Sequence, residues 1–403
     1  MSTKKSRSRP TVVLNDYYPA EMPGAANIAF EFALLASKES SAEFWCGSTA
    51  TDTFEQIENL TIRKFLVNRK RELKRKESLP LRIVNELFPN RGFLWVLKNL
   101  IFHRPGILWI NQIGLRFPRS IILASNLLKI RTIVTVHDFT YIIPRKLYPH
   151  DLSLNDSQVD YFVKEVSSGN VKNLRLTQQR FHQVFKIRLF IMRQILKTAT
   201  CLVFISDLQK SIYEGFFFRS GIVIPNGVSE CRCLTKSSKR EPDTVLFAGR
   251  SAGKGLENLI SQINASNFIL HLAGGPELEI IAATHLDSSK FIYHGLLNQG
   301  QLFELMHTVA FVSVISECFD VFPSVSLEAM RHGALVLCNR TIGSANLVEQ
   351  FSSFTVLKYN TAPDLNRLSA LSKIMPVPRL KILRTPQEVL DHYIITIKSI
   401  ETC

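Results

Sequence analysis

The sequence alternates between short apolar segments and longer segments of helical periodicity, and this alternation constrains the fold more than any other feature. The first apolar segment is Thr11–Asn15, and the helix that follows it begins at Gly24 and covers Ala25–Ser37. Buried parallel strands read as continuous apolar runs, and the helices between them cover the faces of the sheet. The sequence therefore predicts an α/β protein with parallel sheets. Its first half contains the predicted strands Thr11–Asn15, Ile107–Ile110, Thr132–Val136, Leu202–Ile205 and Ile222–Ile224.

The same pattern begins again after the polar segment Ser237–Asp243, where a linker between two domains is expected. A chain of 403 residues suits two domains of about 200 residues each. The last predicted helix begins at Pro386, with Thr385 as its N-cap and Glu388 in its first turn,. The predicted strands of the second half are Val245–Ala248, Ile269–Ala273, Phe291–Tyr293, Ala310–Ile315 and Ala334–Leu337.

These patterns predict two doubly wound, Rossmann-like domains. Residues 1–10 are expected to form a disordered basic tail, residues 11–236 the N-terminal domain and residues 237–385 the C-terminal domain. The last helix, within residues 386–403, is expected to cross back to the N-terminal domain. Doubly wound domains bind ligands beyond the carboxyl ends of their strands, so functional residues are expected in the loops that follow strands.

The net charge of +15 is concentrated in one segment, Ile62–Arg82, which has nine Lys or Arg residues against two Glu. Basic residues near anionic lipid headgroups each contribute about 1 kcal/mol of attraction. The apolar segment Phe93–Leu97 follows soon after and suits a membrane interface,. We therefore expect segment 62–82 to dock on an anionic membrane surface, although a solvated helix face is the alternative. Nucleic acid is not expected as a partner, because no recognition motif accompanies the charge.

The sequence also bears on the cellular compartment. The longest apolar stretch, Gly92–Ile113, is interrupted by Lys98, His103 and Arg104, so no transmembrane helix is expected,. The N-terminus lacks the apolar region of a secretory signal. The seven cysteines are scattered, and Cys231 and Cys233 have no second pair in register, so reduced thiols without a metal are expected. A cytoplasmic protein, peripheral at the inner face of the membrane, is the resulting prediction.

The first candidate constellation is the loop AGRSAGKGLENLI, residues Ala248–Ile260. A predicted buried strand leads into a glycine-rich loop that carries Arg250 and Lys254 and then into a helix. Glycines permit close backbone approach, and a helix N-terminus offers free amides and a positive dipole end. Two cations beside it suit a diphosphate, but Gly255 stands where a Walker A loop has Ser or Thr. A glycine-rich turn with two solvated cations is the alternative.

The second constellation is DVFPSVSLEAM, residues Asp320–Met330. It follows a predicted strand and places Asp320 in a loop and Glu328 in a helix. The backbone between them could present N–H groups at the helix start. An acid before that start could orient sugar hydroxyls, and one a turn inside could chelate a ribose diol. Acids near helix starts are more often simple caps, so this spacing alone is a weak indication.

Together the two constellations resemble the retaining glycosyltransferases of family 4, which have the GT-B fold of two Rossmann-like domains facing a central cleft. Further segments match motifs of that family, specifically from Ile224 to Gly333 and loosely before His137. These segments are Ile224–Val228, Gly274–Glu277, His294–Gly295, Thr135–Asp138, Ser206, and the pair Pro19 and Gly24.

The resemblance implies roles for the matching residues. The N-terminal domain would bind the acceptor and the C-terminal domain the nucleotide sugar. Arg250 and Lys254 would neutralise the donor diphosphate, Asp320 would contact the donor sugar and Glu328 the ribose. His137 would lie near the transferring carbon, although a structural turn residue is the alternative. The implied donor-binding set is completed by Gly24, Gly249, Gly275, His294, Gly295, Phe322, Pro323, Ser324 and Val325.

The chain departs from the family pattern at two positions: Asp320 stands where the family usually has Glu, and Ala25 replaces the second glycine of an N-terminal pair. The chain contains no Asp-x-Asp pair, which metal-dependent sugar transferases use to hold a cation on the diphosphate. Neither a metal nor another cofactor is therefore expected, and Arg250 and Lys254 would supply the positive charge instead.

The predicted function is transfer of a hexose from a nucleotide-diphosphate sugar, with retention of configuration, to a lipid-linked or cell-surface polysaccharide acceptor, as in lipopolysaccharide or capsule biosynthesis. A soluble acceptor is one alternative. Because Asp320 and Ala25 depart from the pattern, a non-catalytic subunit that binds sugar nucleotides is another. An epimerase or phosphorylase of the same fold ranks below both.

Overall fold

The computed structural model describes residues 9–21, 24–50, 53–67, 79–142, 148–149, 178–217, 219–228, 240–249, 254–316, 318–357, 363–372 and 383–401. The chain forms two compact units. The first unit contains Met1–Lys146, Leu152–Pro225 and Pro386–Cys403. The second unit contains Leu147–Asp151 and Asn226–Thr385.

The first unit is built on an eight-stranded sheet in the order β3-β4-β2-β1-β5-β6-β8-β9. Every neighbouring pair is parallel except β3 and β4, which are antiparallel. The predicted parallel sheet is thus confirmed, and β2, β3 and β4 are additions to it. The strands are β1 (Thr11–Asn15), β2 (Ala42–Ser48), β3 (Phe54–Ile57), β4 (Leu60–Leu66), β5 (Ile107–Gln112), β6 (Arg131–Val136), β8 (Cys201–Phe204) and β9 (Ile222–Val223).

The start of the basic segment 62–82 lies in a strand, which contradicts a solvated helix face there. Residues 62–66 belong to β4, and residues 68–78 lie outside the described residues. Lys64 is 6 % exposed and bonds to Glu55 at 2.5 Å, while Arg63 bonds to Glu43 at 2.7 Å. Consecutive residues of a strand point to opposite faces of the sheet, so Arg63 and Lys64 lie on different faces. Each is tolerated in the strand because an acid pairs with it, Glu43 on β2 or Glu55 on β3.

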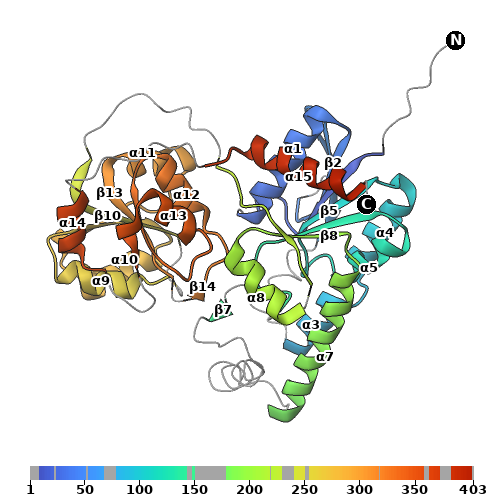
Figure 1. Cartoon of the computed structure of the whole chain (residues 1–403), viewed down its shortest axis with the longest axis horizontal. Coiled ribbons are helices and arrows are strands. Elements are labelled where there is room, and N and C mark those ends of the chain that lie inside the picture. Colours follow the sequence, from blue (N-terminus) through green and yellow to red (C-terminus); the bar gives the residue numbers. More distant parts are fainter. Residues whose placement is uncertain are drawn as a thin grey trace. The chain divides into compact units, whose positions relative to one another are not determined.

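Helices α1 (Ala25–Glu39) and α15 (Pro386–Glu401) pack against each other beside this sheet (Figure 1). Trp109 of β5 lies at the centre of their contact, with its ring 4.2 Å from that of Tyr393 of α15. Thr135 accepts a hydrogen bond from Trp109 Nε1 at 2.9 Å and lies 3.0 Å from the Tyr393 hydroxyl. The last helix of the chain therefore completes the core of the first unit.

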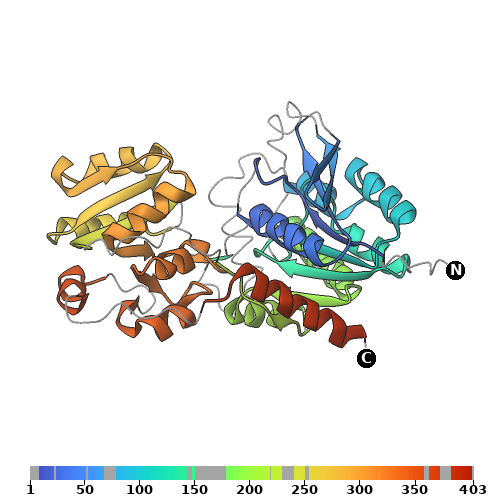
Figure 2. The same cartoon turned by 90° about the horizontal axis from the view of Figure 1, so that it is seen from above.

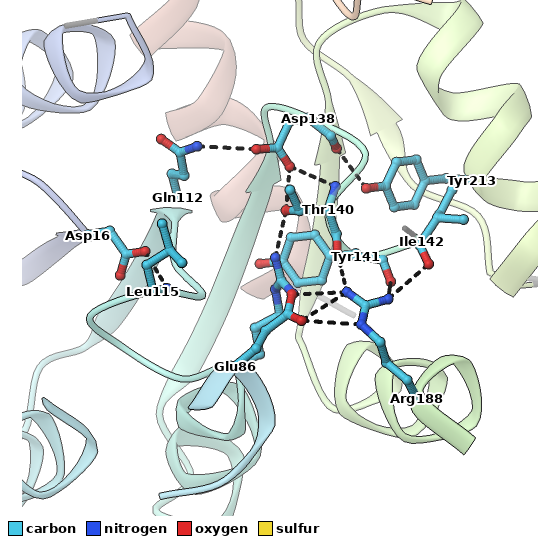
Figure 3. A network of polar contacts seen from close by, with 11 residues as sticks. Asp16, Glu86, Gln112, Leu115, Asp138, Thr140, Tyr141, Ile142, Arg188 and Tyr213 are labelled. Carbon is cyan, nitrogen blue, oxygen red and sulfur yellow. Dashed lines mark hydrogen bonds and ion pairs between the residues drawn. The ribbon is translucent and has the colours of Figure 1, made fainter. Parts of the chain in front are cut away.

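A buried ionic network connects three further helices of the first unit, and Figure 3 shows it from close by. Glu86 pairs with Arg119 and binds Arg188 with both of its oxygens. Arg188 also donates to the carbonyl oxygens of Tyr141 and Ile142. Three helices are thereby joined to the loop after β6. The helices are α3 (Leu79–Leu87), α4 (Arg91–His103), α5 (Ser120–Leu127), α7 (Gln178–Lys197) and α8 (Asp207–Phe217).

The second unit contains a six-stranded, entirely parallel sheet in the order β12-β11-β10-β13-β15-β16. Counted along the chain, this is the order 3-2-1-4-5-6 of a doubly wound domain, whose topological switch point lies between β10 and β13. A short antiparallel pair joins β7 (Tyr148–Pro149) to β14 (Cys318–Phe319). The six strands are β10 (Glu241–Gly249), β11 (Ile269–Gly274), β12 (Phe291–Tyr293), β13 (Val309–Val314), β15 (Leu335–Asn339) and β16 (Val356–Leu357).

Helices cover the sheet of the second unit (Figure 2), as the alternating sequence pattern predicts. Their bounds are α9 (Leu256–Asn264), α10 (Glu277–His285), α11 (Gln299–Thr308), α12 (Ser324–Arg331), α13 (Ala345–Phe351) and α14 (Leu365–Ser372). The start of α11 shows why a helix begins where it does. Asn298 accepts from Gln301 N at 3.0 Å, and the Gln301 side chain accepts from Asn298 N at 3.0 Å, which satisfies two free amides. None of the described helices combines the length and the apolar character needed to cross a membrane.

Candidate functional site

Two loops meet at the switch point of the second unit. One loop follows β10 and carries Lys254, and the other follows β13 and carries Asp320. The Lys254 ammonium group forms an ion pair with the Asp320 carboxylate. The two side chains are 33 % and 16 % exposed, so the pair borders solvent and a ligand can reach it.

A pocket of about 280 Å³ lies beside this ion pair and is here called the switch-point pocket. It lies beyond the carboxyl ends of β10 and β13, where doubly wound domains bind their ligands. Its lining residues are Phe247, Ala248, Gly249, Lys254, Ser313, Val314, Ile315, Ser316, Asp320, Pro323, Ser324 and Val325. The structure therefore brings six of the predicted donor-binding residues together.

Glycines let the loops approach each other closely. Gly255, which begins α9, has a φ of 71°, and a Cβ atom there would lie 2.7 Å from the carbonyl oxygen of Ile315. Gly274, at the end of β11, has a φ of 158°, and a Cβ atom would lie 2.2 Å from the carbonyl oxygen of Gly249. Neither position accommodates a side chain without movement of the backbone.

The backbone of Asp320 is fixed by the loop that follows β15. Asp320 N donates to the carbonyl oxygen of Thr341 at 3.0 Å, and Gly343 N donates to the carbonyl oxygen of Asp320 at 2.8 Å. Asn339 Nδ2 donates to the carbonyl oxygen of Ser316 at 2.7 Å. These bonds tie both ends of segment 316–320 to one rigid loop, so the carboxylate is held at the edge of the switch-point pocket.

Helix α12 begins at the same pocket. Pro323, Ser324 and Val325 line it, and the free amides of a helix start attract anions,. Glu328 lies one turn inside α12 and does not line the pocket. Burial raises the pKa of the Glu328 carboxyl, while a hydrogen bond from the Ser324 hydroxyl opposes this shift. Phe322 is 7 % exposed and belongs to the core.

The predicted residues Gly275, His294 and Gly295 form a neighbouring group at the ends of β11 and β12. Gly274 N donates to the carbonyl oxygen of Gly295 at 2.9 Å, which joins the two loops. The His294 ring stacks on that of His271, and His294 Nε2 lies 3.0 Å from His271 Nδ1. Burial lowers the pKa of both histidines. They therefore act as a neutral hydrogen-bonded pair at neutral pH.

His137 and Gly24 belong to the first unit. His137 follows β6, and its Nε2 lies 2.9 Å from Asn111 Oδ1, which can only accept a hydrogen bond. Burial lowers the pKa of His137 to about 4, so the ring is neutral at neutral pH. Gly24 begins α1 with a φ of 91°. That His137 and Gly24 contribute to the donor site stays a prediction. Arg250, another predicted residue of that site, lies outside the described residues.

The loop that contains His137 is held rigidly. The Asp138 carboxylate accepts bonds from Thr140 N at 2.9 Å and Gln112 Nε2 at 3.2 Å, and its carbonyl oxygen accepts one from the Tyr213 hydroxyl at 2.7 Å (Figure 3). Asp138 is 9 % exposed. It therefore positions the backbone beside His137 and is not open to solvent.

Sequence reasoning missed two serines of the switch-point pocket, Ser313 and Ser316. The buried hydroxyl of Ser313 has no hydrogen-bond partner among the described residues. Such a hydroxyl is a ready contact for a polar ligand, because an unsatisfied buried group is costly. A serine in an apolar strand carries little signal of its own. The signal that could have found Ser313 is its place near the carboxyl end of β13, the strand beside the switch point.

No group of three or more His, Cys, Asp and Glu side chains among the described residues is arranged to hold a metal ion. The switch-point pocket offers the Asp320 carboxylate together with the Lys254 ammonium group. A cation beside the carboxylate disfavours a second cation. Binding of a diphosphate without a metal remains a prediction.

No protein family and no curated protein matches the chain in sequence, but solved structures match it over its whole length. The α,α-trehalose-phosphate synthase (UDP-forming) from Burkholderia vietnamiensis matches with a TM-score of 0.62 at 12% identity, over 98% of this chain and 99% of that chain. WaaG, a glycosyltransferase involved in lipopolysaccharide biosynthesis, matches with a TM-score of 0.57 at 15% identity, over 98% and 99%. HepE from Anabaena, in complex with UDP and glucose, matches with a TM-score of 0.58 at 14% identity, over 97% and 100%.

At these identities the likeness is one of architecture. The matched structures are GT-B glycosyltransferases. The chain therefore has the GT-B fold.

Proposed function

We propose that the protein is a glycosyltransferase that moves a hexose from a nucleotide-diphosphate sugar to an acceptor hydroxyl, with retention of configuration and without a metal. The observation that carries this proposal is the switch-point pocket, where the Lys254 ammonium group and the start of α12 line one cavity. Fixed positive charge and free amides are what a diphosphate needs.

The chemistry assigns roles to these groups. Transfer breaks the bond between the anomeric carbon and a phosphate oxygen, and the electron pair leaves with the diphosphate. Lys254, together with Arg250, stabilises this developing charge, because fixed cations need no rearrangement as the bond breaks. The acceptor hydroxyl bonds to the same face of the sugar and passes its proton to the departing diphosphate oxygen, which has gained the electron pair.

Asp320 and Glu328 are proposed to recognise sugar hydroxyls. Asp320 contacts the transferred hexose, since its carboxylate lines the switch-point pocket beside Lys254. Glu328 binds the ribose from one turn inside α12. The Ser313 hydroxyl, which has no partner among the described residues, completes the polar lining. His137 is proposed to accept a hydrogen bond at Nδ1 near the transferring carbon, because the neutral ring uses its one N–H, on Nε2, to donate to Asn111.

The matched structures support a choice of donor and acceptor classes to propose. HepE is described in complex with UDP-glucose, so UDP-glucose is the first donor to test. WaaG is involved in lipopolysaccharide biosynthesis, which supports a lipid-linked or cell-surface polysaccharide acceptor for this chain. We propose a cytoplasmic protein that works at the inner face of the membrane, and the same fold acting on a soluble acceptor is the close alternative.

The proposal is tested by thermal shift over a set of nucleotide sugars, because a ligand that binds only the folded state raises the melting temperature. Lys254→Ala is expected to lower the affinity for the best ligand by about tenfold or more, since a charge-assisted hydrogen bond is lost. The exposed Arg367 on α14 provides the matched control. An Arg367→Ala variant that loses binding as strongly as Lys254→Ala would show that the effect is one of general charge.

A second candidate is a non-catalytic subunit that binds sugar nucleotides. The ion pair between Lys254 and Asp320 favours it, because a carboxylate already neutralises the described cation of the switch-point pocket. Turnover separates the two candidates. Release of the nucleoside diphosphate that depends on added membrane extract supports transfer, whereas a clear thermal shift without any release supports the binding subunit.

A further inference from the structure

Three neighbouring helices of the first unit, α4, α5 and α7, expose apolar and basic side chains without any acidic one. Helix α4 packs against α5, and α5 packs against α7, along one side of the sheet (Figure 1). The sequences RGFLWVLKNLIFH, SIILASNL and QQRFHQVFKIRLFIMRQILK contain no Asp or Glu. We call the exposed side chains of these three helices the helical docking face.

On α4 the exposed residues form a single stripe. Arg91, Leu94, Lys98, Ile101 and Phe102 are exposed and follow the spacing of one helix face,. The exposed fractions of Leu94, Ile101 and Phe102 are 62 %, 47 % and 73 %, which is high for large apolar side chains. Gly92, Val96 and Leu100 are buried on the opposite face. One face of α4 therefore packs against the protein, and the opposite face exposes apolar and cationic side chains to solvent.

Helix α7 repeats this arrangement. Lys186, Ile187, Phe190 and Lys197 lie on one exposed stripe, and Ile187 and Phe190 are 58 % and 61 % exposed. Between α4 and α7, helix α5 adds Leu123 at 41 % and Leu127 at 74 % exposure. Apolar residues on three adjacent helices make an extended patch, and exposed apolar patches of this kind mark interaction sites.

The charge of the helical docking face is uniformly positive. Arg104 and Lys129 are exposed where α4 and α5 end. None of Arg91, Lys98, Lys186 and Lys197 forms an ion pair with a described residue. The nearby acid Glu86, on α3, is buried and bound by Arg119 and Arg188. The cations are therefore available to an external partner.

The mixture of side chains selects one partner. A second copy of this chain would bring the same cationic surface against itself, and like charges without neutralising acids repel. Nucleic acid would neutralise the cations but would leave Leu94, Ile101, Leu127 and Ile187 without apolar surface to contact,. A bilayer that contains anionic lipid accommodates both the cationic and the apolar side chains. Its headgroups contact the cations, and the apolar side chains enter the boundary of the acyl chains.

We infer that the helical docking face binds the surface of a bilayer that contains anionic lipid. This assignment differs from docking through segment 62–82, because Arg63 and Lys64, described cations of that segment, are paired with Glu43 and Glu55. It rests on the first unit alone and does not depend on transfer activity. Membrane binding and donor binding can therefore fail independently.

The test is flotation of the full chain with vesicles of phosphatidylcholine, with and without about a third of phosphatidylglycerol. We expect binding only to the anionic vesicles, and weaker binding when salt is raised from about 0.05 M to about 0.5 M. Lys98→Glu combined with Phe102→Ser on α4 should lower the partition coefficient by roughly tenfold or more. Lys186→Glu combined with Phe190→Ser on α7 should do the same independently.

The matched control lies on α15 of the same unit, where Ile395 is 64 % exposed and Lys398 is also exposed. Lys398→Glu combined with Ile395→Ser makes the same chemical change and should leave binding within about twofold of wild type. Equal losses from the α15 and α4 variants would overturn the inference. So would a lack of vesicle binding by the wild-type chain, or a dimer in solution that the α4 changes dissociate.

Discussion

Gly255 sets how closely two loops of the switch-point pocket approach each other. It adopts a φ of 71°, and its missing side chain leaves room for the carbonyl oxygen of Ile315. A left-handed conformation costs a non-glycine residue roughly 1–2 kcal/mol. The contact with Ile315 adds to that cost, since backbone atoms cannot rotate away as a side chain can.

We therefore predict that Gly255→Ala destabilises the protein by about 1–3 kcal/mol and weakens nucleotide-sugar binding. Urea unfolding and thermal shift with UDP-glucose measure the two effects. Gly215 in α8 is the control, because it is exposed, helical and has no atom within 4 Å of a built Cβ. Gly215→Ala should be neutral or stabilising by up to about 1 kcal/mol. A Gly255→Ala variant as stable as wild type would contradict the close approach.

Two histidines make stability depend on pH. Burial lowers the pKa of His137 and of His332 to about 4, and His332 is also affected by the charges of His307, Arg331 and Arg240. An exposed histidine has a pKa of about 6.5. Between these values each of these two histidines binds more protons in the unfolded chain than in the folded one. Their contribution to stability is therefore complete above about pH 6.5 and is lost as the pH falls toward 4.

Unfolding free energies measured at several pH values between 7 and 4.5 test this dependence. Each histidine should contribute a slope of about 1.4 kcal/mol per pH unit. His332→Gln should flatten the dependence by that amount, at the expense of the 2.9 Å bond to His307. An unchanged slope in the variant would mean that His332 stays accessible to protons in the folded state.

Among the elements, α15 illustrates how a segment distant in sequence completes a core. Val389, Leu390 and Tyr393 are each 1 % exposed and belong to one core cluster with residues of α1, β1 and β2. The Tyr393 ring packs against those of Trp109 and Phe32. Isolated helices of about this length are marginal in water, so packing against this cluster is what holds α15 in place.

We predict that Tyr393→Ala costs about 3–5 kcal/mol, because a large buried aromatic ring leaves a cavity. Tyr393→Phe should cost about 1 kcal/mol, since it removes only the hydroxyl near Thr135. Ile395→Ala, two residues further along and largely exposed, should change stability by less than about 0.5 kcal/mol. Chemical denaturation of the three variants gives the comparison. Equal costs for Tyr393→Ala and Ile395→Ala would show that α15 does not dock as described.

At the scale of the whole molecule, the alternation of strands and helices was predictable because buried parallel strands are apolar throughout. The predicted strands from Val245 to Leu337 all have counterparts in the second sheet, although β10 begins earlier, at Glu241. Strands β2 and β4 were not predicted. Their sequences include Glu43, Arg63 and Lys64, and these charges are tolerated only because they pair across neighbouring strands.

The residues of the candidate site also fall into a group that the sequence predicts and a group that it does not. Glycines and charges in loops that follow strands have a local signature, so the Lys254 and Asp320 loops were predictable. No local sequence signature marks Ser313, Asn339 and Thr341. Their roles arise only when β13 and β15 become neighbours in the sheet. Asn339, at the end of β15, and Thr341, just beyond it, fix the loop that holds Asp320 only through hydrogen bonds to that loop. Contacts of this kind are properties of the fold and cannot be read from one segment.

The return of α15 has a consequence for the order in which the protein matures. Tyr393 follows Thr135, its partner in the core of the first unit, by 258 positions. During synthesis the strands of that unit leave the ribosome early, yet the helix that seals Trp109 from water arrives only after the whole second unit has emerged. The first unit therefore begins to fold first but is completed last. A nascent chain stalled before residue 386 would expose to chaperones the apolar surface that α15 covers.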